Sequence, residues 1–225
     1  MSRVGVRGRP EGARGGAGEC VAVPVAVLPE EAARELAPRL RALAEERVRA
    51  SSPDAGTGAG ASSDAGTPSE PDTTAGDARA PREPVPVVVI DGYSGAGKST
   101  LAEALARLLP GWRILHLDDW YPGWDGLAAG AQVAARIAAD LRAGRASSYV
   151  AWDWGANAPG PEREVPLAPT IIEGCGAIEA DADLSVWLED PGEDERRRRA
   201  LARDGATYAP HWRRWAVQDK GRSIK

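Results

Sequence analysis

The chain contains little of what several common protein classes need. Its 225 residues include only 2 cysteines, Cys20 and Cys175, which lie far apart and lack the spacing of metal ligands. We therefore expect neither a disulfide framework nor a zinc site. No apolar run approaches the roughly 20 residues that a membrane-spanning helix requires. A formal net charge of −5 argues against a general nucleic-acid binder.

The N-terminus has some features of an export signal. Residues 1–10 are rich in arginine, and an apolar stretch follows at residues 21–28. That stretch is short, contains Pro24 and continues directly into a charged helical pattern, which is not the organisation of a signal peptide. The sequence therefore predicts a cytoplasmic protein with no membrane partner and no nucleic-acid partner.

Lysine is also rare, since it occurs only at positions 98, 220 and 225. Lys98 belongs to Gly-Tyr-Ser-Gly-Ala-Gly-Lys-Ser at residues 92–99, which matches the phosphate-binding pattern G-x-x-x-x-G-K-[ST]. An apolar run at 85–90 precedes the motif and a helical pattern at 99–109 follows it, as a strand and a helix would. The plainer alternative is a glycine-rich turn between these two elements.

The chemistry of the motif predicts ATP and Mg²⁺ as ligands. Backbone N–H groups of the loop and the N-terminal end of the following helix would surround the phosphates. Lys98 would reach the phosphate oxygens, and the hydroxyl group of Ser99 would bind Mg²⁺. The residues expected to bind the nucleotide are Gly92, Tyr93, Ser94, Gly95, Ala96, Gly97, Lys98, Ser99 and Thr100.

The composition divides the chain into four segments. Residues 1–28 are expected to form a disordered extension, and residues 29–49 carry the apolar period of a helix, which Pro38 would split or kink. Residues 50–84 consist mainly of Ser, Gly, Pro, Asp, Thr and Ala and are expected to form a flexible linker. The folded domain is then expected to span residues 85–225.

Within this domain, short apolar runs alternate with helical patterns. The runs suit strands that are buried on both faces of a parallel sheet. Their alternation with helices predicts an α/β fold of three layers, α/β/α, around a mainly parallel sheet. The expected strands lie at 87–90, 112–117, 169–172 and 184–188, and the expected helices lie at 99–109, 127–143 and 191–204.

Acidic residues follow each of these four strands, at the end where ligands of such sheets bind, namely Asp91, Asp118-Asp119, Glu173 and Glu189-Asp190. Asp118 suits a base for a substrate hydroxyl group, a ligand of Mg²⁺ or a cap in a loop, and Asp119 is equally well explained by a loop. Glu173 suits Mg²⁺ binding, directly or through water, or a structural turn. Further on, Arg196, Arg199 and Arg203 share one helical face, which suits either a transferring phosphoryl group or a solvated surface.

Together these residues resemble the small-molecule kinases of the P-loop NTPase superfamily, in the group of uridine kinase, pantothenate kinase and phosphoribulokinase. The resemblance covers residues 85 to about 215. In that group the first acid of an Asp-x-Phe-Tyr-like motif is the catalytic base, and Asp118-Asp119-Trp120-Tyr121 is similar to this motif. Trp152-Asp153-Trp154 is similar to the segment that holds sugar hydroxyl groups in uridine kinases.

The resemblance also implies a role for each candidate residue, with Glu173-Gly174 similar to the Glu-Gly of the family and residues 192–215 forming a lid. It implies Asp118, Lys98, Arg199 and Arg203 as catalytic residues, Asp119, Tyr121, Asp153 and Arg196 as contacts of the phosphoryl acceptor, and Ser99 and Glu173 as ligands of Mg²⁺.

Two departures from the family pattern are visible. Residues 152–166 contain no His-x-Arg of the uridine kinase type, which leaves acceptors other than uridine or cytidine open. The chain also ends at Lys225, soon after the lid, whereas these kinases usually continue into a further strand. Because residues 219–225 show no strand pattern, we expect a sheet that lacks its last strand.

Tryptophan is abundant, with 8 residues, whereas phenylalanine is absent. Several aromatic residues fall in the two segments that are expected to flank the acceptor. They would either form flat walls that stack on a base or a sugar, or pack in the core and the lid. These residues are Trp120, Tyr121, Trp124, Trp152 and Trp154.

The sequence thus favours an ATP-dependent phosphotransferase that acts on a hydroxyl group of a small molecule, with a nucleoside as the leading acceptor. The alternatives are a kinase of nucleoside monophosphates or of another metabolite, and a regulatory protein that binds ATP with little turnover. A GTPase is disfavoured because the chain has no Asn-Lys-x-Asp motif. The sequence does not indicate an oligomeric state.

Overall fold

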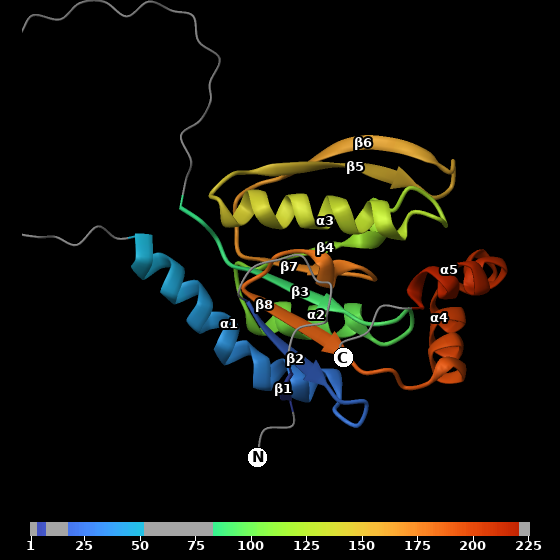
Figure 1. Ribbon diagram of the computed structural model, residues 1–225, viewed down its shortest axis with the longest axis horizontal. Helices are drawn as coiled ribbons and strands as arrows, with labels where there is room; N and C mark the ends of the chain where they lie inside the picture. Colours follow the sequence, from blue (N-terminus) through green and yellow to red (C-terminus); the bar gives the residue numbers. More distant parts are fainter. Residues whose placement is uncertain (1–3, 8–17, 52–82, 221–225) are drawn as a thin grey trace, which may run out of the picture.

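The computed structural model describes residues 4–7, 18–51 and 83–220 (Figure 1). The main sheet contains β1 (Gly5–Arg7), β2 (Glu19–Val23), β3 (Val87–Asp91), β4 (Arg113–His116), β7 (Thr170–Glu173) and β8 (Leu184–Leu188). A separate hairpin consists of β5 (Ser147–Asp153) and β6 (Ala158–Val165). The helices are α1 (Pro29–Ser51), α2 (Lys98–Leu108), α3 (Leu127–Arg142), α4 (Glu193–Tyr208) and α5 (Trp212–Asp219), with short 3₁₀ helices at Leu117–Asp119, Ala177–Glu179 and Ala209–His211.

The main sheet has the strand order β1-β2-β8-β3-β7-β4, and only the pair of β1 and β2 is antiparallel. This confirms the predicted α/β fold with a mainly parallel sheet. All residues of β3 are buried, as expected for a strand that is covered on both faces. The predicted strands and helices between residues 85 and 204 appear within a few residues of their expected bounds.

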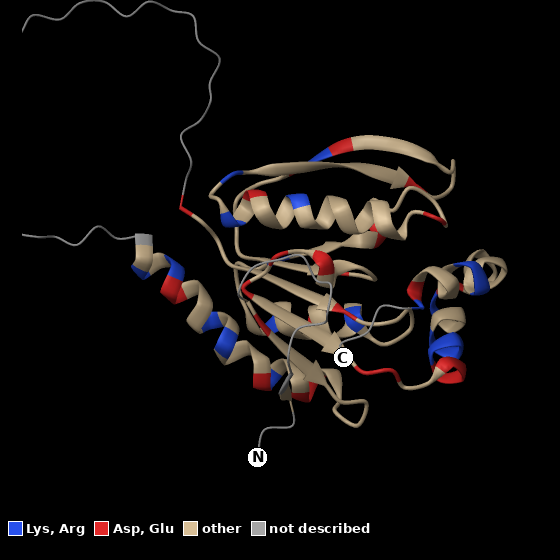
Figure 2. Ribbon diagram, in the orientation of Figure 1, with Lys and Arg blue, Asp and Glu red and all other residues tan. Residues whose placement is uncertain are grey.

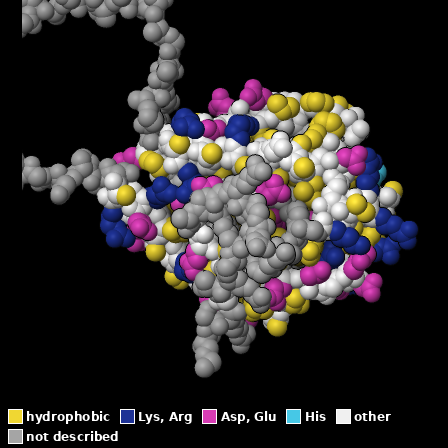
Figure 3. All heavy atoms as spheres, in the orientation of Figure 1, with side chains coloured by type: hydrophobic (Ala, Val, Ile, Leu, Met, Phe, Trp, Pro, Cys, Tyr) yellow, Lys and Arg dark blue, Asp and Glu magenta, His cyan; other side chains and the backbone are white. Residues whose placement is uncertain are grey.

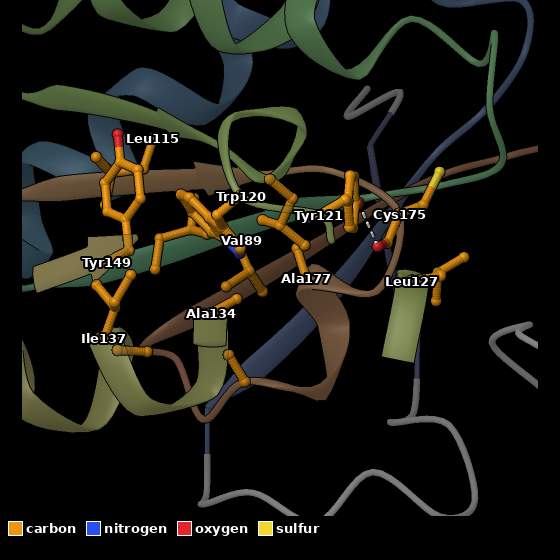
Figure 4. Packing of buried hydrophobic residues seen from close by; sticks show 14 of the residues in the cluster. Val89, Leu115, Trp120, Tyr121, Leu127, Ala134, Ile137, Tyr149, Cys175 and Ala177 are labelled. Atoms are coloured by element: carbon orange, nitrogen blue, oxygen red, sulfur yellow. Dashed lines mark hydrogen bonds between the residues drawn. The ribbon is translucent and has the colours of Figure 1, made fainter. Parts of the chain in front are cut away.

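Alternate side chains of β3 enter two cores on opposite faces of the sheet. Val88 and Ile90 pack in a core with residues of α1 and α2. Val87 and Val89 pack in a second core with residues of α3 and of the hairpin, part of which Figure 4 shows. In Figure 1, α3 lies between the sheet and the hairpin, whereas α1 and α2 cover the other face. The result is the predicted α/β/α arrangement, with the hairpin as an additional outer layer.

The N-terminal part of the chain corrects our prediction. Disorder over residues 1–28 does not hold for the described part of that segment, because β1 and β2 belong to the main sheet. β2 pairs in parallel with β8, from Glu19 opposite Leu184 to Val23 opposite Leu188. The sheet therefore includes strands from before residue 85. We expected a sheet that lacks its last strand, but β2 pairs with β8 and extends the sheet beyond it.

The predicted helix at 29–49 is present as α1, which continues through Pro38 without a split. Leu36 and Leu40, on either side of this proline, are both fully buried in the core with α2. Tertiary burial therefore outweighs the hydrogen bond that a proline inside a helix removes. The rest of the extension (residues 1–3 and 8–17), the linker at 52–82 and residues 221–225 lie outside the described residues.

Two elements between residues 144 and 220 have no counterpart in our prediction. One is the hairpin of β5 and β6. Most residues of β6 are exposed to solvent, and buried and exposed residues do not alternate regularly along this strand. The other is α5, a short helix with two buried tryptophans, Trp212 and Trp215. Among the described residues, no helix has both the length and the apolar character needed to cross a bilayer.

Candidate functional site

The predicted phosphate-binding loop joins β3 to α2 at the carboxyl end of a central strand. Gly95 has a φ of +81°, and a side chain there would place its Cβ 2.2 Å from the backbone oxygen of Arg196 in α4. Only glycine permits this conformation and this close approach without strain. The loop and α4 therefore touch through their backbones, so that a segment about a hundred residues later in the chain helps to shape the loop.

Lys98 begins α2 and turns its side chain back over the loop. Its Nζ donates to the backbone oxygens of Gly92 at 2.9 Å and Tyr93 at 3.1 Å, and lies 3.3 Å from Cys175 Sγ. Burial alone would lower the pKa of Lys98, but negative charge around it raises the pKa above its usual value. The groups responsible are Cys175, Asp219, Glu173 and Asp91. Lys98 is thus a buried ammonium group in an acidic surrounding.

Asp91, the last residue of β3, fixes the loop to a neighbouring turn. Its side chain is fully buried, and Oδ1 accepts a hydrogen bond from the N–H of Gly92 at 2.6 Å. Oδ2 accepts from the N–H groups of Gly176 and Ile178, both at 3.0 Å. Because these three donors come from two segments, Asp91 sets where the loop lies relative to the turn after β7.

Ser99 and Glu173, the two predicted ligands of Mg²⁺, are in contact. Ser99 Oγ donates to Glu173 Oε1 at 2.9 Å, and the same oxygen lies 2.5 Å from His116 Nδ1. Burial would raise the pKa of Glu173, but the hydrogen bond from His116 and the charge of Lys98 outweigh it and lower this pKa. Glu173 is therefore ionised at neutral pH.

A hydroxyl group beside an ionised carboxylate is a donor set that suits Mg²⁺, which prefers oxygen ligands and keeps some water or phosphate oxygens. No group of three or more His, Cys, Asp and Glu side chains forms a metal site in the part of the chain that the structure describes. A bound Mg²⁺ would therefore be held by Ser99, by Glu173 and by oxygens of the nucleotide. Ser99 and Glu173 therefore fit a Mg²⁺ that is also bound by phosphate oxygens.

A cavity of about 920 Å³ opens in front of the loop. It brings together residues from the phosphate-binding loop, α2, the end of β4, the end of β7 and the α4–α5 region. The candidate residues that line it are Ser94, Gly95, Gly97, Lys98, Ser99, Thr100, Asp118, Tyr121, Glu173, Arg199 and Arg203. A second cavity of about 320 Å³ lies beside the loop, next to residues 23–29, and shares Gly97, Thr100 and Arg199 with the first.

Asp118 lies in a 3₁₀ helix directly after β4 and lines the large cavity. Its side chain is open to solvent through the mouth of the cavity, yet the surrounding protein limits its hydration and raises its pKa. The carboxylate of Glu173 raises this pKa further, whereas Arg203 and Lys98 lower it. Asp118 is therefore a carboxyl group with raised basicity beside the phosphate-binding loop.

The arginines of α4 differ in position (Figure 2). Arg199 and Arg203 line the cavity, and their side chains pair with Glu195 and Asp204 of the same helix. Arg196 does not line it. Its side chain is buried against the loop, where it donates to Asp190 at 2.7 Å and to the backbone oxygen of Ser94 at 3.3 Å. Arg196 thus supports the loop from behind, whereas Arg199 and Arg203 face the cavity.

The aromatic residues divide between core and cavity. Trp120 is buried against Tyr149 and belongs to the core, and Trp152 lies outside the lining of the cavity. Trp124 and Trp154 line it, with their rings 4.8 Å apart, and Trp154 Nε1 donates to the backbone oxygen of Asp118 at 2.8 Å. Packing in the core is therefore confirmed for Trp120, whereas stacking of Trp124 and Trp154 on a ligand stays a prediction.

Tyr121 belongs to both the core and the cavity. Its ring is buried and lines the cavity, and its hydroxyl group donates to the backbone oxygen of Cys175 at 2.6 Å (Figure 4). This bond ties the segment after β4 to the turn after β7. Tyr121 therefore positions the two strand ends that carry Asp118 and Glu173.

Two other predicted contacts of the acceptor lie away from the cavity. Asp119 accepts a long hydrogen bond of 3.4 Å from Tyr149 of the hairpin. Asp153 caps the turn of the hairpin, where its Oδ1 accepts from the N–H groups of Gly155 and Ala156. Both carboxylates are engaged in local structure, so the structure does not bring them to the site with Asp118.

Several residues of the site have no signal in the sequence. His116 and Cys175 are single residues at strand ends, Tyr208 is the last residue of α4, and Trp215 belongs to α5. Asp219 of α5 is buried and accepts a hydrogen bond from the N–H of Ser94. The only available hint was the spacing of Trp212 and Trp215, which would place both on one helical face.

No protein-family model matches the chain, and no curated protein sequence matches it. Solved structures are similar to it, and two of them illustrate the likeness. A protein from Bacillus stearothermophilus, provisionally described as a uridine kinase, is 19% identical, covers 61% of this chain and 86% of its own, and has a TM-score of 0.39. A protein from Silicibacter sp. TM1040, provisionally described as a fructose transport system kinase, is 22% identical, covers 62% and 81%, and has the same TM-score of 0.39.

Proposed function

We propose that the protein is a phosphotransferase that moves the terminal phosphoryl group of ATP to a hydroxyl group of a small molecule. The observation that carries this proposal is the position of the phosphate-binding loop between two cavities. Gly97, Thr100 and Arg199 line both of them, so a phosphoryl group held at these residues would be reached from either side. A donor on one side and an acceptor on the other is the arrangement that transfer requires.

The smaller cavity suits the nucleoside end of ATP. Much of its lining is apolar and comes from β2, the segment after it, and the end of β8. Val25 and Leu28, which line it, are the large apolar side chains of this segment that remain exposed. A flat base would cover such side chains and remove apolar surface from water.

In the larger cavity we assign the acceptor and the catalytic groups. Lys98 would neutralise charge on the phosphoryl oxygens, and Asp118 would accept the proton of the attacking hydroxyl group. Mg²⁺, held by Ser99 and Glu173, would supply charge stabilisation for the phosphate oxygens. Arg199 and Arg203 would hold the transferring group in place. Trp124 and Trp154 would stack against the acceptor, for which we propose a nucleoside.

The test is the release of ADP from ATP·Mg²⁺ in the presence of a panel of nucleosides, nucleoside monophosphates and sugars. We expect release that depends on one acceptor class. Lys98→Ala should lower the rate by at least about 10²-fold, because it removes charge stabilisation of the transition state. Arg107→Ala, an exposed cation at the other end of α2, is the matched control and should keep the wild-type rate.

The result also separates the kinase from the regulatory alternative. Slow release of ADP that no acceptor accelerates would replace the kinase by a nucleotide-binding regulatory protein. Release that depends on nucleoside monophosphates or on a sugar would keep the phosphotransferase and change its acceptor. A protein that binds no ATP, or a Lys98→Ala variant with wild-type turnover, would overturn the proposal for the loop itself.

A further inference from the structure

α5 places a carboxylate on the phosphate-binding loop. Asp219, the last residue of α5, has 2% of its surface exposed, and its Oδ2 accepts a hydrogen bond from the N–H of Ser94 at 2.9 Å. The same oxygen lies 3.8 Å from Cys175 Sγ, which in turn lies 3.3 Å from Lys98 Nζ. In Figure 1, α4 and α5 stand at the end of the sheet toward which β3 and β8 run.

These surroundings are those that a phosphate group would use. A loop N–H and a buried ammonium group are the donors that such a loop offers to anions. Burial lowers the pKa of Lys98, and the negative charge of Asp219 is, after that of Cys175, one of the charges that raise it, which places the carboxylate within electrostatic reach of the ammonium group. Asp219 lines neither cavity but places a negative charge against the loop through the N–H of Ser94, so a phosphate bound at the loop would lie near a like charge.

Core packing and polar contacts together hold α5 against the site, with Trp212 and Trp215 buried in the core that also contains residues of α3. Gln218 Nε2 donates to the backbone oxygen of Trp124 at 2.7 Å, and the ring of Trp215 packs edge-on against Tyr121 at 4.9 Å. Just before α5, Tyr208 donates from its hydroxyl group to Ser94 Oγ at 2.9 Å. Gln218 Oε1 also accepts from the N–H of Leu127 at 3.4 Å, so Tyr208 ties this region to the loop and Gln218 ties α5 to the start of α3 and the residues before it.

A hinge precedes this segment. Gly205 lies within α4 but has non-helical angles, φ 56° and ψ −133°, so the helix is broken there. No atom lies within 4 Å of the place that its Cβ would occupy, which leaves the backbone room to rotate. Glycine adopts such angles without the strain that other residues incur. The break at Gly205 thus separates the arginine-bearing part of α4 from the part of the chain that leads to α5.

We propose that α5 is an autoinhibitory latch, in which Asp219 occupies the phosphate-binding loop of the ligand-free protein and leaves when nucleotide phosphates bind. The proposal rests on the proposed binding of nucleotide by this loop, but not on catalysis. When only the open form binds, the apparent affinity equals the affinity of the open form multiplied by the fraction of molecules that are open. Weakening the latch then tightens the binding of nucleotide.

The experiment measures the dissociation constant of ATP, with and without Mg²⁺, by titration calorimetry of the full chain. Asp219→Asn keeps the size and the hydrogen-bond acceptor but removes the charge, and we expect it to bind ATP about ten-fold more tightly. Gln218→Ala loosens α5 without a change of charge, and we expect it to bind ATP a few-fold more tightly. Asp140→Asn, which removes one carboxylate on α3 outside both cavities, is the matched control and should bind as the wild type does.

The outcomes separate the latch from the function on which it rests. Unchanged or weaker binding of ATP by Asp219→Asn would overturn the latch. Tighter binding by Asp219→Asn with unchanged binding by Gln218→Ala would also overturn it, because the charge of Asp219 would then repel the nucleotide without any movement of α5. If neither the wild type nor any variant binds ATP, the proposed function fails instead. Circular dichroism spectra would establish that each variant is folded before its affinity is compared.

Discussion

Two segments flank the phosphate-binding loop, one from earlier in the chain and one from later, and they are held in different ways. β2 and α1 join the main sheet and the core, where Val21, Leu36 and Leu40 are fully buried. α4 and α5 bury Ala200, Trp212 and Trp215 in the other core and reach the site through side-chain hydrogen bonds, stacked aromatic rings and a helix broken at Gly205. The first segment therefore extends the sheet, whereas the second shapes the large cavity and contains the helix break.

Both segments carry acidic and basic residues, as α1 and α4 show (Figure 2), and acidic and basic side chains are interspersed over the face in Figure 3. Exposed pairs such as Arg198 with Glu195 add little to stability. The arginines that matter for the proposed function are those that line a cavity, Arg199 and Arg203.

The largest expected effect follows from removing residues 1–84. Because β2 pairs with β8 and α1 covers α2, we expect the remaining chain to lose its cooperative fold and with it any binding of ATP. The expectation reverses what the sequence suggested, namely a domain that begins at residue 85. Far-UV circular dichroism and thermal unfolding would measure the loss.

A milder variant sharpens the same comparison. Leu40→Ala in α1 should lower the free energy of unfolding by about 2–5 kcal/mol, since it leaves a cavity in the core. Arg214→Ala in α5, which breaks an exposed pair with Asp125, should leave the melting temperature unchanged. A truncated chain that melts cooperatively at the wild-type temperature would show that β2 and α1 are not part of the scaffold.

The sequence predicted the elements around the loop because their signals are local. Residues 87–90 and 184–188 are apolar runs of strand length, and the loop motif carries its own strand–loop–helix context. β2 was missed because Glu19–Val23 lies between glycine-rich and proline-containing segments, and only its pairing with β8 makes it a strand. Propensity alone could not show a partner strand that lies more than 160 residues later.

The residues of the candidate site likewise differ in whether a local sequence pattern could reveal them. Lys98, Ser99, Asp118 and Glu173 could be predicted because each follows a strand within a recognisable pattern. Asp219 could not, since its contact with Ser94 depends on how α4 breaks at Gly205 and how α5 packs. Asp153 was predicted for the acceptor on a short local match, whereas its carboxylate caps the turn of the hairpin.

The next effect in size concerns the proposed catalytic base. Asp118→Asn should lower turnover by roughly 10²–10⁴-fold with nearly unchanged affinity for ATP, because an amide cannot accept the proton of the acceptor. Asp119→Asn is the matched control, since Asp119 contacts Tyr149 and does not line the cavity. Steady-state kinetics with the best acceptor would measure both variants.

The two substitutions can also fail in informative ways. If Asp118 chiefly holds Mg²⁺, Asp118→Asn should weaken the binding of ATP·Mg²⁺, and raised Mg²⁺ should partly restore the rate. Equal damage from both substitutions, or greater damage from Asp119→Asn, would show that the roles of the two carboxylates are assigned wrongly here.

The smallest expected effect is a shift in the pH profile, and its sign follows from the surroundings of Asp118. Restricted hydration and the charge of Glu173 raise the pKa of Asp118 above its ordinary value of 3.8, against the opposing charges of Arg203 and Lys98. A base acts in its ionised form, so kcat/KM should fall as the pH falls through this raised pKa. The acid limb should therefore lie at a higher pH than an ordinary aspartate would give.

The same shift predicts the effect on stability. A carboxyl group whose pKa is raised on folding binds its proton more tightly in the folded state, so stability falls as the pH rises between the unfolded and the folded pKa. At neutral pH the ionised Asp118 thus costs stability, and Asp118→Asn should melt no lower than the wild type while it loses the acid limb of the rate profile. A variant that keeps the limb, or that melts well below the wild type, would place the titrating group elsewhere and give Asp118 a structural role instead.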